Sequence, residues 1–241
     1  MFYRSVLALL TFVILALATA APARADVIQL LSRAQLTPGG VTTDYPNLPI
    51  GVTAAVVASP LTVPAGATTV TFIAAAGVIP NEFLRVNQGV GFLGNFPPGT
   101  ELLVTENRFG TPVGPLTINF NTPVLEFGLD AQNNLFAVDT TSLFTFSVFN
   151  GAGMSFTFTR GGPDTLGLFF LGARATPGDI ITRVVISGSS TLPLSFAQNN
   201  FAVGPVTIQP VPEPATMMLL GTGLVGAAVS RYRKRRQAKT E

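Results

Sequence analysis

Alternation of apolar and hydroxyl side chains is the feature that most constrains this chain. Within Leu143–Phe149, phenylalanine and valine take every second position, and threonine and serine lie between them. The alternation returns within Met154–Thr159, after the turn residues 150–153, which include two glycines. A period of two places each kind of side chain on its own face of a strand. The pattern predicts a β-hairpin with one buried face.

Residues 26–210 are predicted to be a single all-β domain. The chain has 24 glycines and 19 prolines, which favours many turns between short strands, and no helical stripe of apolar residues occurs outside the two ends. We expect an antiparallel jelly-roll-like β-sandwich, with a closed barrel as the alternative. Residues 36–67, rich in Thr, Pro and Gly, are interpreted as edge strands and loops. The remaining strand candidates are Val27–Gln35, Val52–Val57, Thr68–Ala74, Leu102–Thr105, Leu116–Phe120, Val124–Leu129, Leu166–Leu171, Ile180–Ile186 and Phe201–Ile208.

The first 25 residues are typical of a secretory signal peptide. Arg4 precedes the apolar run Val6–Ala18, and small residues follow at the spacing that signal peptidase requires. The predicted cleavage site comprises Ala23, Ala25 and Asp26, with cleavage after Ala23 as the alternative. An uncleaved membrane anchor is less favoured, because the run is shorter than the roughly 20 residues of a membrane span. A signal helix implies the Sec translocon and signal peptidase as partners.

The other end of the chain has the pattern of a short membrane anchor. A proline-rich junction is followed by the uncharged segment Ala215–Val229, which as a helix is about 22 Å long at 1.5 Å per residue. This is short for a hydrocarbon core of about 30 Å. The following basic cluster is expected to stop transfer and to stay in the cytoplasm. It consists of Arg231, Arg233, Lys234, Arg235 and Arg236.

Residues 211–236 resemble the PEP-CTERM sorting signal of exported proteins from Gram-negative bacteria that make exopolysaccharide. The resemblance rests on the motif Val211, Pro212, Glu213 and Pro214, the short apolar helix with glycines, and the arginine cluster. The same segment is also known as an ice-binding protein C-terminal domain, a label that does not itself imply ice binding. The resemblance implies exosortase, a membrane-embedded cysteine transpeptidase, as partner, with Glu213 as a recognised charge. An ordinary tail anchor is the alternative.

These features divide the chain into a signal peptide (1–25), a β-sandwich ectodomain (26–210) and a sorting signal (211–241). The expected route is export to an inner-membrane intermediate with the ectodomain in the periplasm. From there the protein is expected to reach the cell surface or the medium.

A second, more diffuse resemblance covers residues 99–208, which are similar to a jelly-roll ectodomain common in PEP-CTERM proteins. It rests on 99–103, 114–120, 123–128, 181–186 and 201–204. Many related sandwiches have an aspartate near a calcium or ligand site in the last strand. Gly204 takes the corresponding position here.

Composition excludes most familiar catalytic chemistry. The chain has no Cys, no His and no Trp, which removes thiol nucleophiles, imidazole bases and Cys/His zinc sites. Residues 26–210 carry six arginines and no lysine against ten acids, so this domain lacks the clustered positive charge of nucleic-acid binding. We therefore predict no catalytic residue, no cofactor, no metal site and no nucleic-acid partner.

The nominal carboxylate candidates for glycoside hydrolysis are Glu101, Glu106, Glu126 and Asp130, and each is expected to be a solvated loop or surface residue. Glu126 and Asp130 lie four residues apart in a predicted strand, over 13 Å of extended chain, which is too far for a catalytic pair. Asp130, Gln132, Asn133 and Asn134 offer oxygens of the calcium-binding type without the spacing of an EF-hand loop.

The favoured function is a non-catalytic, exosortase-processed surface or matrix protein associated with exopolysaccharide. The alternative is a calcium-dependent carbohydrate-binding module on the same scaffold. The body lacks the aromatic platforms that sugar binding often uses, since Tyr45 is its one tyrosine.

Overall fold

The computed structural model describes residues 26–38, 40–43, 45, 54–77, 79–89, 95–133, 142–162, 168–189 and 196–204. The chain divides into two compact units, residues 1–208 and 209–241, and the described residues all belong to the first. The helices expected at the two ends lie outside the described residues. Within the described ranges, no helix has the length and apolar character that crossing a membrane requires.

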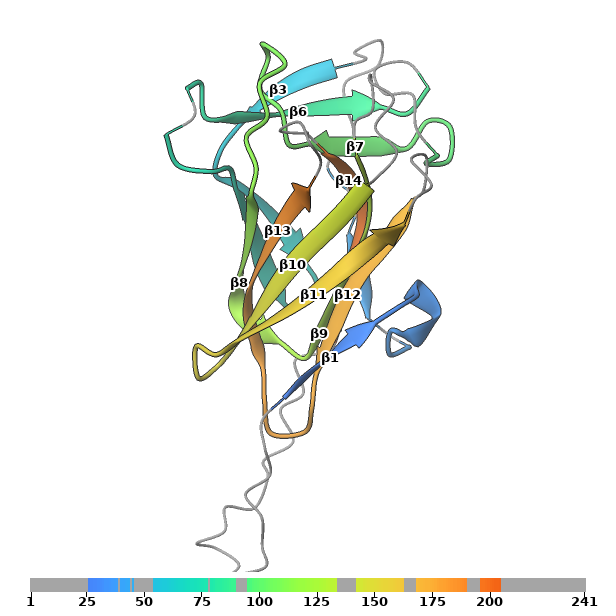
Figure 1. Ribbon diagram of the computed structural model, residues 1–241, viewed down its shortest axis with the longest axis vertical. Helices are drawn as coiled ribbons and strands as arrows, with labels where there is room; N and C mark the ends of the chain where they lie inside the picture. Colours follow the sequence, from blue (N-terminus) through green and yellow to red (C-terminus); the bar gives the residue numbers. More distant parts are fainter. Residues whose placement is uncertain are drawn as a thin grey trace, which may run out of the picture. The chain divides into compact units, whose positions relative to one another are not determined.

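The described strands form two antiparallel sheets (Figure 1). Sheet A has the order β1 (Val27–Leu30), β12 (Phe169–Ala175), β9 (Glu126–Asn133), β14 (Phe196–Val203), β7 (Glu101–Val104), β6 (Glu82–Asn87) and β3 (Ala54–Ala58), with β2 (Val41–Thr43) also paired to β14. Sheet B has the order β11 (Ser155–Gly162), β10 (Ser142–Asn150), β13 (Ile181–Ser189), β8 (Leu116–Val124), β5 (Thr68–Ile73) and β4 (Leu61–Ala65). The predicted jelly-roll-like sandwich is thus confirmed for this part of the chain.

The predicted hairpin is present as β10 and β11. Phe146 lies opposite Phe158, and Ser147 lies opposite Thr157 in the next pair. Phe144, Phe146 and Val148 are completely buried, whereas Thr157 and Thr159 are exposed. The period-two pattern therefore selected the buried face correctly.

Phenylalanine dominates the core between the two sheets. Phe127 of sheet A meets Phe146 of sheet B edge to face, with ring centroids 6.3 Å apart, and Phe72 of sheet B meets Phe201 of sheet A at 5.5 Å. These four rings are each at most 1% exposed. Burying such a side chain contributes about 1.5–3 kcal/mol. The expectation that the phenylalanines form the core is confirmed.

A second, smaller apolar cluster involves β6, β7 and β14, and consists of Val86, Phe96, Leu102, Val104 and Ala197. Leu103 belongs to the main core, although it neighbours Leu102 and Val104 in β7. Strands β6 and β7 are therefore buried on both faces. A strand buried on both faces loses the alternation that reveals a strand in sequence, and β6 was not among the predicted strands.

Several predicted strand boundaries were wrong, and for the first strand the structure shows the local cause. The strand expected at Val27–Gln35 ends at Leu30, because the Gln35 side-chain oxygen accepts hydrogen bonds from the backbone N–H groups of Leu31 and Ser32 and closes a 3-10 helix, Arg33–Gln35 (η1). Strand β12 begins and ends later than Leu166–Leu171, and β14 begins at Phe196 rather than Phe201. The region 36–67 supplies β2, β3 and β4, and β3 and β4 are edge strands as expected.

Candidate functional site

Sheet B presents hydroxyl and amide side chains between its core positions. Its alternate residues, which are exposed or half-buried, are mainly Thr, Ser and Asn. The apolar exceptions on the central strands include Ile73, Leu143, Phe149 and Val185. We call the following set the hydroxyl face: Thr62, Thr69, Thr71, Thr117, Asn119, Thr145, Ser147, Thr157, Thr159 and Ser187.

Hydroxyl groups on neighbouring strands bind one another across this face. The oxygens of Ser147 and Thr157 are 2.9 Å apart, and those of Thr62 and Thr71 are 3.1 Å apart. The register also places Thr145 opposite Thr159 and Thr71 opposite Asn119. Each hydroxyl can both donate and accept a hydrogen bond, so the paired groups keep capacity for a polar ligand.

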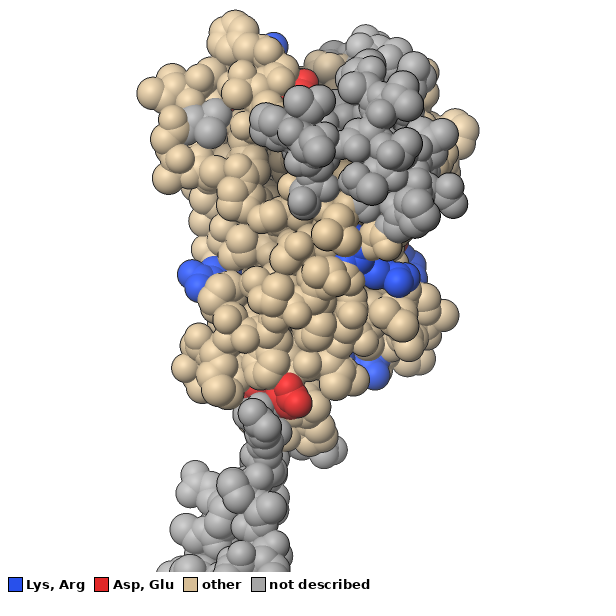
Figure 2. All heavy atoms as spheres, viewed as in Figure 1, with Lys and Arg blue, Asp and Glu red and all other residues tan. Residues whose placement is uncertain are grey.

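The hydroxyl face carries almost no charge. As far as the structure describes them, the six strands of sheet B contain no acidic residue and two arginines, Arg160 and Arg183. The guanidinium carbon of Arg183 lies 3.8 Å from the centroid of the Phe149 ring. Figure 2 shows only scattered charged side chains on the described part of the surface in that view.

Sheet A differs, because its described strands carry four acids and all four are in ion pairs. Glu126 accepts from Arg174 at 2.7 Å, and Asp130 accepts from Arg33 at 2.9 Å. The other two pairs are Glu82 with Arg108 and Glu101 with Arg85.

The two ion pairs on β6 have different environments. Arg108 donates to both carboxylate oxygens of Glu82, at 2.7 and 2.6 Å, and these bonds hold the pKa of Glu82 below its ordinary value of 4.5. The same bonds raise the pKa of Arg108. Arg85 is buried, and burial lowers its pKa, partly offset by the charge of Glu101. All these arginines remain charged near neutral pH.

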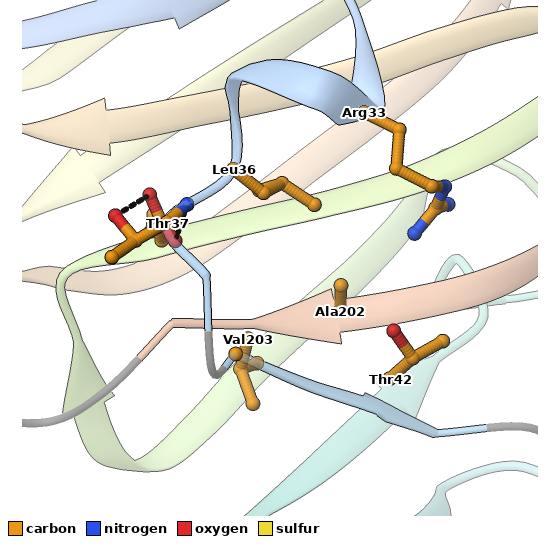
Figure 3. Close-up of a pocket in the computed structure, with 8 residues that line it drawn as sticks. Arg33, Leu36, Thr37, Thr42, Ala202 and Val203 are labelled. Carbon is orange, nitrogen blue, oxygen red and sulfur yellow. Dashed lines mark hydrogen bonds between the residues drawn. The ribbon is translucent and has the colours of Figure 1, made fainter.

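The chain between β1 and β2 lies against sheet A and forms a shallow pocket. The described residues of this segment are 31–38 and 40. They are anchored at Thr37, whose backbone N–H and hydroxyl donate to the Glu126 carboxylate at 2.7 and 3.1 Å. Figure 3 shows the side chains of Arg33 in η1 and of Leu36, the residue that follows η1, projecting toward the strand that carries Ala202 (β14). The pocket has a volume of about 220 Å³ and is lined by Arg33, Leu36, Thr37, Gly40, Thr42, Glu126, Ala202 and Val203.

Gly204 is essential to this arrangement for a reason that its sequence position did not reveal. A Cβ atom built on Gly204 would lie 2.1 Å from Cγ of Glu126. The Gly204 backbone N–H also donates to the Glu126 carbonyl at 2.9 Å. The glycine at the position where the second resemblance leads one to expect an aspartate therefore makes room for a buried, ion-paired glutamate.

The structure corrects the expectation of solvated carboxylates for three of the four acids. Glu126 is 1% exposed and paired with Arg174, while Glu101 and Asp130 are half-buried and paired. Glu106 is half-buried and forms an isolated β-bridge with Pro112. Tertiary pairing of this kind leaves no local signal in sequence, because partners such as Glu126 and Arg174 are far apart along the chain.

Of the four residues considered for calcium, two bind other groups of the protein, one is buried with no hydrogen-bond partner for its side-chain oxygen among the described residues, and one lies outside them. Asp130 is bonded to Arg33, and the side-chain oxygen of Gln132 accepts from the backbone of Asn95 at 2.7 Å. Asn133 is buried and Asn134 is outside the described ranges. The described residues contain no group of three or more acids that could hold a metal ion.

Most residues of the predicted sorting and processing sites lie outside the described part of the chain. These are Ala23, Ala25, Val211, Pro212, Glu213, Pro214, Arg231, Arg233, Lys234, Arg235 and Arg236. Asp26 is described: its backbone N–H donates to the Thr176 hydroxyl at 3.0 Å, and its carbonyl accepts from the Thr176 N–H at 2.9 Å. Cleavage before Asp26 remains a prediction.

Comparison with known proteins gives one match in sequence and a distant likeness in structure. Residues 210–235 match the family model of the PEP-CTERM protein-sorting motif, which confirms the resemblance found in the sequence. A motif of this kind implies an exported protein that exosortase processes. No curated protein matches the sequence.

Two solved structures from Clostridium thermocellum show the distant likeness. The first contains the CBM22-1 and GH10 modules of endo-1,4-beta-D-xylanase 10B with xylohexaose, at 11% identity and a TM-score of 0.25, over 68% of this chain and 28% of that one. The second is the family 11 carbohydrate-binding module of the cellulase Lic26A-Cel5E, at 9% identity and a TM-score of 0.27, over 69% of this chain and 94% of that one.

Proposed function

We propose that this chain, which carries a PEP-CTERM protein-sorting motif, is a non-catalytic cell-surface or matrix protein whose sandwich binds exopolysaccharide. The proposed route is export through the Sec translocon, anchoring in the inner membrane with the sandwich in the periplasm, and release or re-attachment by exosortase. The sorting motif at residues 210–235 supports the route. The hydroxyl face supports the proposal that the ligand is a polysaccharide.

The hydroxyl face suits a neutral sugar polymer for a thermodynamic reason. Burying a charge on binding costs far more than burying a hydroxyl that finds a hydrogen-bond partner. The Thr, Ser and Asn side chains on this face can exchange water for sugar hydroxyls with little net cost. Phe149, half-buried beneath Arg183, adds an aromatic surface beside them.

A non-catalytic role agrees with the state of the carboxylates. A retaining or inverting glycosidase needs two carboxyl groups that face the same bond. Glu82, Glu101, Glu126 and Asp130 each bind an arginine. Their charges are used within the protein, and this supports a binding role.

The ligand is tested by co-sedimentation of the full-length chain with exopolysaccharide from the producing bacterium. Thr157→Glu places a charge on the hydroxyl face, and we expect retention to fall about tenfold, or 1.4 kcal/mol. Thr42→Glu makes the same substitution at an exposed threonine of sheet A and is expected to leave retention unchanged. Equal retention of both variants and the unmodified chain would contradict the proposal.

A parallel measurement with chelator separates the alternative function. A calcium-dependent carbohydrate-binding module would lose retention when calcium is removed, whereas the hydroxyl face has no need of a metal. We therefore expect the same retention with and without chelator. Loss of retention in chelator would favour the alternative.

The route is tested by Glu213→Ala, which removes the charge from the sorting motif. Export should continue, because the signal peptide is intact, while C-terminal maturation should stop. Mass spectrometry of the exported protein measures this directly. Normal trimming of the variant would show that Glu213 is not recognised.

A further inference from the structure

Strand β3 ends sheet A beyond β6 and is an unusual edge strand. Its five residues, Ala54–Ala58, are all alanine or valine. Exposure alternates along it, with Ala54, Val56 and Ala58 exposed, and Val56 is 43% exposed. An edge strand offers a row of backbone donors and acceptors to any other strand, and natural proteins normally protect it with charge, proline or covering groups.

The other three strands that end the two described sheets, β1, β11 and β4, have such protection. At one side of the sandwich, β1 and β11 are joined by side chains: Gln29 donates to the Thr159 carbonyl at 3.3 Å, and Arg160 donates to the Leu31 carbonyl at 2.8 Å. The edge strand β4 contains Pro64, which has no N–H to offer. Strand β3 contains no proline, no glycine and no charged residue.

The register of β3 against β6 shows which backbone groups point outward. Ser59 lies opposite Asn81 and donates to its carbonyl at 3.1 Å, so this is a hydrogen-bonded pair. Hydrogen-bonded and non-bonded pairs alternate in an antiparallel ladder. Val57 and Ala55 therefore bond to β6, and the N–H and C=O groups of Ala54, Val56 and Ala58 point away from the sheet.

We propose that β3 is a docking edge for a second copy of this chain, which pairs with it antiparallel about a twofold axis at Val56. In this register Val56 faces Val56 of the second copy, and Ala54 faces Ala58 of the second copy. Every outward N–H and C=O group then finds a partner, which gives six hydrogen bonds. This assembly goes beyond the proposed function and does not depend on it.

The side chains of β3 favour a second copy as the occupant. Between the paired strands every side chain meets an alanine or valine, so no like charges face each other, and β-branched pairs stabilise antiparallel strands. Val56 lies on the same side of the sheet as Leu84, which packs against the second apolar cluster. The twofold axis thus brings two such apolar surfaces together and supplements the backbone bonds.

Cysteine cross-linking tests the proposed register. The chain has no natural cysteine, and a hydrogen-bonded antiparallel pair has Cα atoms about 5.5 Å apart, within the range that a disulfide spans. Val56→Cys in the full-length chain in detergent should therefore form a covalent dimer under mild oxidation. The control is Val41→Cys, at an equally exposed valine (42%) of β2. Dimer formation no greater than in the control would overturn the proposal.

Sedimentation of an edge variant tests the interface without a covalent bond. Val56→Lys places two like charges opposite each other on the axis, and self-association should weaken at least about tenfold. Val41→Lys should leave it unchanged. Circular dichroism verifies that both variants are folded. A monomeric unmodified chain at every concentration, or equal association of both variants, would also overturn the proposal.

Discussion

The two sheets of the sandwich share one core but carry different kinds of polar side chain. All four acids of the described strands belong to sheet A, and each is paired with an arginine. The described strands of sheet B carry no acid and present the hydroxyl face. The acids of sheet A bind arginines within the protein, whereas sheet B presents neutral polar groups at the surface. The comparison shows that the outer face of sheet B differs in kind from that of sheet A: its polar groups are neutral, and most are exposed or half-buried.

Close packing accompanies the charges of sheet A. Gly128 and Gly172 lie opposite each other on β9 and β12, and a Cβ on either would lie 2.5 Å from the ring of Phe170. The guanidinium of Arg33 lies 5.4 Å from the centroid of that ring while it binds Asp130. Glycine, aromatic ring and arginine thus form successive layers on this side. Changes there should be costly, and changes on the hydroxyl face should not.

Gly204→Ala should have the largest effect. The new methyl group would overlap Glu126, which three hydrogen bonds hold in place, and overpacking of this kind costs roughly 1–3 kcal/mol. Denaturant unfolding measures the loss. A cycle with Glu126→Ala should show that the double variant loses less than the sum of the single variants. Simple additivity would mean that the contact is not the cause.

Substituting one arginine on each sheet should give the next largest difference in stability. Arg33→Ala removes an ion pair and the contact with Phe170, and should cost about 1 kcal/mol, because the side chain is 35% exposed and the pair is partly screened by water. Arg183→Ala on sheet B removes only an exposed contact with Phe149, and should cost less than about 0.5 kcal/mol. The comparison between the sheets fails if Arg183 proves the more important of the two.

Low pH should reduce the stability of the fold by protonating Glu82. We expect this effect to be smaller than those of the substitutions above, because the side chain of Arg108 is 53% exposed. The pKa of Glu82 is lowered, so its bond to Arg108 stabilises the fold above pH 4.5 and this contribution is lost as pH falls through the lowered pKa. Arg108→Gln should therefore be less stable than the unmodified chain at pH 7, and the two should converge at pH values well below 4.5. A constant difference down to acid pH would contradict this linkage.

Substitution on the hydroxyl face should have the smallest effect on stability. Ser147→Ala and Thr157→Val each remove one partner of an exposed hydroxyl pair, and we expect changes within about 0.5 kcal/mol. Thermal unfolding measures this. A loss as large as that of Gly204→Ala would mean that the face is structural, like sheet A.

The sequence predicted sheet B better than sheet A, and the reason is burial. Strands β10 and β11 have one buried and one exposed face, so Phe146 and Ser147 report their environments directly. Strand β6 lies between two apolar clusters, and its residues Phe83 and Leu84 are apolar in succession. Strand β4 includes Pro64, and β2 has only three residues. Neither strand has an alternating pattern long enough to be distinguished from the surrounding loop sequence, which is rich in Thr, Pro and Gly.

The candidate site was less predictable than the fold. The hydroxyl face follows from the same alternation that predicts the core, yet Thr62, Thr117 and Thr157 share one face only because β4, β8 and β11 belong to one sheet. The pairing of Arg33 with Asp130 and of Arg174 with Glu126 depends on tertiary contacts across 97 and 48 residues. Gly204 attracted notice as a missing aspartate, whereas its role is steric.

The near absence of charge on the hydroxyl face has a consequence for where such a surface can work. Dissolved ions weaken attraction between exposed charges over a distance of about 8–10 Å at ordinary ionic strength. This screening does not act on hydrogen bonds between neutral hydroxyl groups. A contact made through Ser147 and Thr157 should therefore be as strong in brine as in fresh water, which suits a face turned toward an environment the cell does not control.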